Sequence, residues 1–67
     1  MTIGQSIKRA RMERGISQSE LSEMIGTSQA IISLWECDRF TPCTYNLISI
    51  ADAFDISLDE LVGRERK

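Results

Sequence analysis

The apolar residues of this chain recur at spacings of three and four positions, which is the pattern of amphipathic α-helices. In the first segment, for example, Ile3, Ile7 and Ala10 share one face of a helix. No segment alternates with the period of two that marks a half-buried strand. The pattern predicts an all-α fold. Its five helices lie over about Ile3–Arg14, Gln18–Ile25, Gln29–Glu36 and Thr44–Phe54, with a short fifth helix after Ser57.

Local signals mark where several of these helices begin and end. Ser17 and Glu20 have the spacing of a capping box, in which each side chain bonds to the other residue's backbone N–H, and Ser57 and Glu60 repeat it. Gly15 is placed to end the first helix in the left-handed conformation that glycine tolerates. Apolar pairs able to form hydrophobic staples flank the two boxes: Ile16 with Leu21, and Ile56 with Leu61.

The segment Gln18–Cys37 has the residue spacing of a helix-turn-helix. Gly26 falls at the turn, where a residue with positive φ lets the second helix leave at a steep angle. Ser28 follows as a helix N-cap, whose hydroxyl accepts an otherwise unpaired backbone N–H. The apolar positions expected to be buried are Leu21, Ile25, Ile32 and Trp35. Few folds need this combination, and it points to a protein that lays one helix against DNA.

The charge of the chain qualifies this interpretation, because a DNA-binding domain usually shows a basic footprint. The 67 residues include ten acidic and eight basic ones, which gives a net charge of −2. The charges are segregated, however. Basic residues lie in the first helix, just after the third helix and at the C-terminus: Lys8, Arg9, Arg11, Arg14, Arg39, Arg64, Arg66 and Lys67. Acidic residues are concentrated in the C-terminal third, ahead of the basic residues at 64–67. Such a distribution can bind phosphate on one side, with an affinity that falls steeply with salt.

The length of the chain predicts one small domain with a single core, for which dimerisation would be a natural supplement. We treat residues 1–67 as one helix-turn-helix domain and expect residues 64–67 to be a flexible basic tail. No apolar run approaches the ~20 residues of a membrane span, and no signal peptide opens the chain. We therefore expect a cytoplasmic protein with no membrane partner.

Catalytic chemistry has little support in this sequence. The chain has no histidine, which removes Ser–His and Cys–His nucleophile pairs, and it has no phosphate-binding glycine loop. We expect no enzyme, no catalytic residue and no cofactor. Cys37 and Cys43 lack the further ligands of a zinc site, so we expect reduced thiols and no metal. Cys37 is expected to fill space behind the third helix, and Cys43 or Thr41 to cap the fourth.

Several blocks of the sequence fit one family pattern over about Ile3–Gly63. They are Ile7 and Arg11, Ser17-Gln18-Ser19-Glu20-Leu21, Ile25-Gly26-Thr27-Ser28-Gln29, Ile32 with Trp35-Glu36, Pro42, and Ala51 with Phe54-Asp55-Ile56-Ser57-Leu58-Asp59-Glu60-Leu61. Together they resemble the helix-turn-helix domains of phage Cro and lambdoid repressors, the XRE family. The resemblance implies a compact five-helix domain of the lambda-repressor type. It also implies a sequence-specific transcriptional regulator, a repressor, that inserts its third helix into the major groove as a dimer.

The resemblance assigns roles in DNA contact. In that family the Gln matching Gln18 holds a phosphate at the start of the second helix, a position that suits an anion. Residues matching Gln29, Ala30 and Leu34 face base edges, where Gln can bridge adenine N6 and N7 and Ala can touch a thymine methyl. The alternative for Gln29 is an ordinary polar residue at a helix start. The DNA-contacting set that we expect is Gln18, Ser28, Gln29, Ala30, Ile31, Ser33, Leu34, Arg39, Thr44 and Tyr45.

Departures from the family pattern leave a second function open. Ile31 and Leu34 are apolar at outward positions that are usually polar, so they can read thymine methyls or form a patch that binds a protein. Alternatively, a slight rotation of the helix tucks one of them into the core, Ile31 more readily than Leu34. Asp38 replaces the usual Gly after the third helix and puts a negative charge near the expected phosphate path. The alternative function is a protein-interaction module, such as an antitoxin-like partner.

Two further expectations concern packing and assembly. Arg11 and Glu36 match an Arg–Glu pair that tethers the first helix to the third in lambdoid repressors, and a carboxylate inside so small a core needs such a partner. The fifth helix is too short to be stable alone, and an apolar residue left exposed on it would meet its copy across a two-fold axis. We expect a homodimer through Leu58 and Val62, since Leu61 is committed to the staple. The alternative is a monomer that pairs only on DNA.

Overall fold

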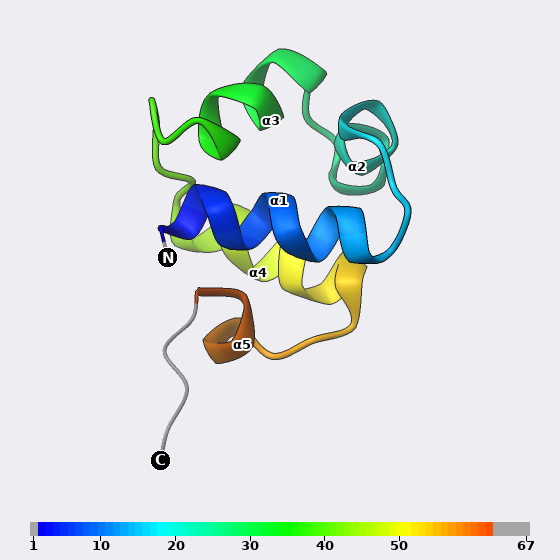
Figure 1. The fold of residues 1–67 in the computed structure, drawn as a ribbon, viewed down its shortest axis with the longest axis vertical. Helices are drawn as coiled ribbons and strands as arrows, with labels where there is room; N and C mark the ends of the chain where they lie inside the picture. Colours follow the sequence, from blue (N-terminus) through cyan, green and yellow to red (C-terminus); the bar gives the residue numbers. More distant parts are fainter. Residues whose placement is uncertain (1, 63–67) are drawn as a thin grey trace.

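The computed structural model describes residues 2–62, and the expected tail at 64–67 lies outside the described residues. Within the described part the chain forms helices and no strands, as predicted (Figure 1). The helices are α1 (Ile3–Glu13), α2 (Gln18–Ile25), α3 (Gln29–Glu36), α4 (Thr44–Phe54) and α5 (Leu58–Val62). One predicted bound changes, because Arg14 is the C-cap residue of α1 rather than its last helical residue.

Both predicted capping boxes form in the structure. At α2 the Ser17 hydroxyl accepts from the Glu20 N–H at 3.0 Å, and the Glu20 carboxylate accepts from the Ser17 N–H at 2.8 Å. Ser57 and Glu60 make the same two bonds before α5. Each box satisfies backbone N–H groups that the first turn of a helix leaves unpaired. Local sequence therefore sets where α2 and α5 begin.

Every helix contributes one fully buried aliphatic side chain to a common core. In the order α1 to α5 these side chains are Ile7, Leu21, Ile32, Ile50 and Leu61. Trp35 of α3, predicted to be a core aromatic, is also buried, as is Phe54 of α4. In Figure 1, α1 runs across the middle of the domain, with α2 and α3 on one side of it, α5 on the other and α4 behind it. Within this arrangement α3 packs mainly against α1 and α2, so these two helices set its position.

The start of α1 packs closely against the end of α3. Gly4 permits this approach, because a β-carbon there would overlap the backbone carbonyl oxygens of Trp35 and Glu36. Asp38 adopts the left-handed conformation, with φ of 63°. Its carboxylate accepts hydrogen bonds from the Gly4 N–H at 3.1 Å and from the hydroxyl of Thr2, the N-cap residue of α1, at 2.7 Å. The charge of Asp38 thus lies at the N-terminus of α1, where the helix dipole favours an anion.

Arg14 joins the other end of α1 to α4. Its guanidinium donates from Nε to the Phe54 carbonyl at 3.1 Å and from Nη1 to the Ala10 carbonyl at 3.0 Å. The same group lies 5.1 Å from the centroid of the Phe54 ring, within the range of a cation–π contact. The Phe54 carbonyl is one of the last four of α4, for which the helix itself supplies no N–H donor. Arg14 therefore stabilises the C-terminal end of α4 while fixing it to α1.

Candidate nucleic-acid interface

A tight turn connects α2 to α3. Gly26 adopts the left-handed conformation expected at this position, with φ of 75°. The Thr27 N–H then donates to the Ser22 carbonyl at 2.9 Å. Ser28 caps α3, since its hydroxyl accepts from the Ile31 N–H at 3.2 Å. Local sequence thus produces the predicted helix-turn-helix, and the buried faces of both helices hold it against the core.

The outer surface of α3 is uncharged over its first turns. Gln29, Ala30 and Ile31 are exposed, with 37% of Ile31 accessible. Ser33 and Leu34 are half-buried. The alternative in which Ile31 turns into the core is therefore wrong, and Leu34 is the more covered of the two apolar residues. Packing of α3 against its neighbours sets this rotation and leaves an aliphatic side chain on the surface expected to contact DNA.

A chain of polar contacts links the interior of the domain to this surface. Arg11 of α1 donates to Glu36 of α3 from Nε to Oε2 at 2.7 Å and from Nη2 to Oε1 at 3.1 Å. The Gln18 side-chain amide donates to the same Oε1 at 3.0 Å. The Gln29 amide in turn donates to Gln18 Oε1 in a long hydrogen bond of 3.4 Å. The structure thus joins the predicted Arg11–Glu36 pair to Gln18 and Gln29, which the sequence assigned to phosphate and base contact.

The Arg11–Glu36 pair is buried, so its charged groups need hydrogen-bond partners inside the domain. The accessible fraction is 12% for the Arg11 side chain and 4% for the Glu36 side chain. A buried carboxylate is costly unless its lone pairs are satisfied, and here three N–H donors reach it. Arg11 Nη1 also donates to the Ile16 carbonyl at 2.8 Å. Over residues 2–62, no buried side-chain nitrogen or oxygen lacks a partner, so this network is complete within the domain.

The residues expected near phosphates lie on the segment that follows α3 and on the first turn of α4. Arg39, Thr44 and Tyr45 are all exposed there, and 83% of Tyr45 is accessible. Phe40, beside Arg39, is a second exposed aromatic, 61% accessible, that was not predicted from the sequence. The sequence signal that could have identified Phe40 as exposed is its place between two predicted helices, outside the apolar stripe of either. This part of the surface can therefore offer a cation, hydroxyls and aromatic rings to a partner.

Both cysteines are free and exposed. The expectation that Cys37 fills space behind α3 was wrong, because it follows the last helical residue and its thiol instead donates to the Ser33 carbonyl at 2.9 Å. Cys43, rather than Thr41, is the N-cap residue of α4, without a side-chain cap bond. Among the described residues, no group of three or more His, Cys, Asp or Glu side chains could hold a metal ion.

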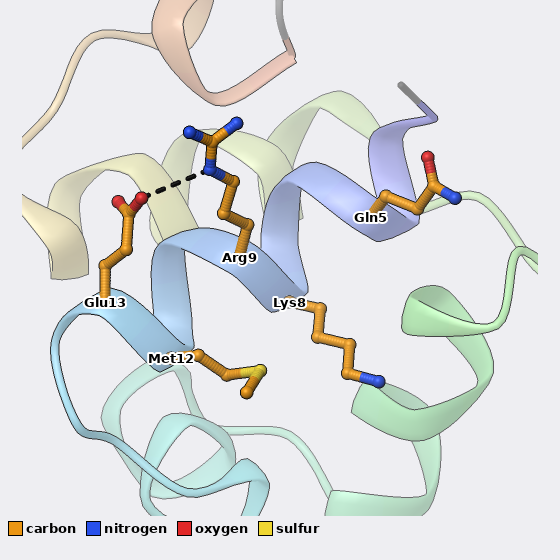
Figure 2. A pocket seen from close by; sticks show the side chains of 5 residues that line it. All are labelled: Gln5, Lys8, Arg9, Met12 and Glu13. Atoms are coloured by element: carbon orange, nitrogen blue, oxygen red, sulfur yellow. Dashed lines mark hydrogen bonds and ion pairs between the residues drawn. The ribbon is translucent and has the colours of Figure 1, made fainter.

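Shallow hollows occur elsewhere on the surface. One of about 430 Å³ follows the outer face of α1 and is lined by Gln5, Lys8, Arg9, Met12 and Glu13 (Figure 2). Figure 2 shows these side chains spread along one helix, with an exposed Arg9–Glu13 ion pair of 3.2 Å. A second, of about 360 Å³, is lined by Ile16, Glu20, Glu23 and Met24. Neither brings together the converging polar groups of a catalytic site. None of the helices in residues 2–62 has the length and apolar character to cross a membrane.

The five-helix arrangement and the turn at Gly26 together define a fold class, the five-helix helix-turn-helix domain. Residues 7–61 match the family model described as Helix-turn-helix (HTH_3), and the chain belongs to this family. The family resemblance inferred from the sequence is therefore confirmed.

Relatives among curated proteins are transcriptional regulators rather than enzymes. The immunity repressor protein of Bacillus phage phi105 is 37% identical over 65 residues, which are 97% of this chain and 45% of that protein. The cryptic phage CTXphi transcriptional repressor RstR of Vibrio cholerae is 34% identical over 64 residues, 96% of this chain and 57% of that protein. The chain thus spans about half the length of the curated relatives it matches.

Solved structures confirm the fold. The P22 c2 repressor in complex with a synthetic operator superposes with a TM-score of 0.88 at 31% identity, covering 97% of this chain and 98% of that one. SinR, a master regulator for biofilm formation solved in complex with DNA, gives a TM-score of 0.84 at 36% identity, covering 90% of this chain and 97% of that one. The predicted lambda-repressor-like architecture is therefore correct.

The buried ion pair predicts the effect of removing one partner. Arg11→Ala is expected to lower the free energy of unfolding by about 3–5 kcal/mol, because it leaves the Glu36 carboxylate buried without its cation. Changing both Arg11 and Glu36 to Met should recover much of this loss, since no charge then remains buried. Arg9→Ala, which breaks the exposed pair with Glu13, is the control and should change stability by less than about 1 kcal/mol. Chemical denaturation followed by circular dichroism measures all of these. A midpoint for Arg11→Ala equal to the parent's would contradict the structural role.

Proposed function

We propose that this domain is a sequence-specific transcriptional regulator, a repressor, that inserts α3 into the major groove of DNA. The observation that carries the proposal is the contact between Gln18 and Gln29, the first residues of α2 and α3. In this position one side chain can hold a phosphate while the other reaches a base edge. The likeness to the P22 c2 repressor, a protein solved in complex with an operator, supports the proposal.

Contact with phosphate is compatible with the net charge of −2. Gln18 opens α2, where backbone N–H groups and the helix dipole favour an anion. Arg39 follows α3 as an exposed cation. The carboxylate of Asp38, expected near the phosphate path, accepts hydrogen bonds from Thr2 and Gly4 at the N-terminus of α1. Because these hydrogen bonds hold the Asp38 carboxylate against α1, they support an approach of phosphate to the start of α2 and to the loop after α3.

Base recognition falls to the uncharged face of α3. The Gln29 amide offers one donor and one acceptor, which match the N7 and N6 positions of adenine. Its bond to Gln18 holds the amide in place before DNA arrives, which reduces the entropy lost on binding. The other expected contacts on this helix come from Ser28, Ala30, Ile31, Ser33 and Leu34.

The proposal predicts different effects for the two glutamines. Gln29→Ala is expected to lower discrimination between a duplex selected from a random pool and its single-base variants by about 1–3 kcal/mol. Gln18→Ala should weaken binding to the selected duplex and to a scrambled one alike, because a phosphate contact carries no base information. Fluorescence anisotropy titrations at fixed salt measure both. Unchanged base preferences in Gln29→Ala would refute the base-reading role.

We further propose that the domain acts as a homodimer through α5. Leu58 and Val62 are half-buried within one copy, whereas Leu61 is buried in the core with 1% accessible. The helix has five residues and packs on α1 and α4, so a second copy can cover the apolar surface that it leaves open. Such a dimer would hold two copies of α3 at a fixed separation, suited to inverted half-sites centred about 34 Å apart.

Sedimentation without DNA, at micromolar and higher concentrations, measures the oligomeric state. The parent is expected to sediment as a dimer, and Leu58→Lys and Val62→Lys as monomers, because a charge would be buried in the interface. Met24→Lys is the control, since Met24 is 51% accessible but lies on α2. A parent that is monomeric throughout would rule out a preformed dimer, and a dimer that survives both lysine changes would place the interface elsewhere.

A protein-interaction module, such as an antitoxin-like partner, is the second candidate function. The exposure of Ile31, together with that of Phe40 and Tyr45, favours it because apolar side chains of this size are the usual anchors of protein interfaces. Selection from a random duplex pool separates the two candidates. Enrichment of one sequence supports the regulator, whereas no enrichment combined with a stable complex with a protein partner supports the module.

A further inference from the structure

The helix-turn-helix of this chain lacks the side chains that most often read guanine. Residues 15–38, which include α2 and α3, contain four acidic residues and no lysine or arginine. Arginine and lysine are the residues that pair with the O6 and N7 acceptors of guanine in the major groove. Arg39, the next basic residue, lies beyond the end of α3. Base recognition by α3 therefore rests on amide, hydroxyl and apolar side chains.

The exposed side chains of α3 match the chemistry of A·T pairs. Gln29 offers the donor and acceptor that adenine requires, and the C5 methyl of thymine is the apolar group that a base pair presents in the major groove. Ala30 and Ile31 are exposed, and Leu34 follows them at spacings of four and three residues, so each of the two lies next to Leu34 on the helix surface. Ile31 retains apolar surface to cover, since 37% of it is accessible.

We propose that α3 recognises a half-site rich in A·T pairs, with thymine methyl groups packed against Ala30 and Ile31. The inference rests on the proposed function, because it names the bases that α3 reads. Withdrawing one methyl group from water changes affinity by about fourfold. Burial of methyl groups, added to the adenine contact of Gln29, then supplies the specificity that arginine supplies in helices that read guanine.

The test compares thymine with uracil, which keeps the same hydrogen-bonding groups but lacks the methyl. A duplex is selected with the full chain from a random pool, and each of its thymines is replaced by deoxyuridine in turn. We expect half-sites dominated by A·T pairs. We also expect one or two thymines in each at which the replacement lowers affinity by about fourfold, the effect of one buried methyl. Anisotropy titration of the unaltered protein measures this, so no variant has to fold.

A matched pair of variants assigns the effect to a side chain. In Ile31→Ala the preference for thymine over uracil should fall from about fourfold to below about twofold at one of these positions, because the methyl loses its apolar partner. Ile48→Ala is the control, since Ile48 is also an exposed isoleucine, with 43% accessible, but lies on α4. It should keep the parent's preference. Circular dichroism checks that both variants are folded.

The outcomes separate this inference from the proposed function. Selected half-sites made of G·C pairs, or equal affinity for thymine and uracil at every position, would overturn the inference while leaving sequence-specific DNA binding intact. A thymine preference that is unchanged at every position in Ile31→Ala would overturn the assignment to Ile31. Failure to enrich any duplex would remove the proposed function itself, and the inference with it. The exposed Ile31 would then be left for a protein partner.

Discussion

The buried carboxylate of Glu36 is the constraint on which the arrangement of the first three helices depends. Glu36 belongs to α3, and it accepts hydrogen bonds from Arg11 of α1 and from Gln18 of α2. The Glu36 side chain is only 4% accessible, and its buried charge destabilises the fold unless these donors are in place. The three helices must therefore pack in one register. Gly4 permits this register, because a larger residue would push the start of α1 away from the end of α3.

The contacts that satisfy the carboxylate also reach the surface proposed to bind DNA. Gln18 uses its amide nitrogen on Glu36 and its oxygen on Gln29, so one residue connects the ion pair to the side chain proposed to read a base. Side chains held in place before binding lose less entropy when DNA arrives. This arrangement suits a chain whose helix-turn-helix carries no lysine or arginine between Arg14 and Arg39. Side chains that are positioned before binding, together with apolar contacts, can then contribute binding free energy that positive charges on these helices do not supply.

Signals that act over a few residues predicted most of the fold. The capping boxes of α2 and α5 and the left-handed turn at Gly26 depend on near neighbours alone, so the sequence was sufficient for them. The rotation of α3 was not predictable in this way, because packing of whole helices decides that Ile31 is exposed and Leu34 half-buried. The residues proposed to contact DNA come from the family resemblance. The bond from Gln18 to Glu36 could not be predicted, since it joins residues 18 positions apart on different helices.

The affinity of the Arg11→Met/Glu36→Met protein for the duplex selected by the parent tests this account most directly. The variant is expected to keep the fold, but Gln18 loses the acceptor that orients it. If the ion pair holds Gln18 and Gln29 in place for DNA, the variant should bind about fivefold more weakly than the parent, which is the effect of one hydrogen bond. The titration is made at a temperature where circular dichroism shows both proteins fully folded. Equal affinities would show that the buried pair serves stability alone, and would contradict the account.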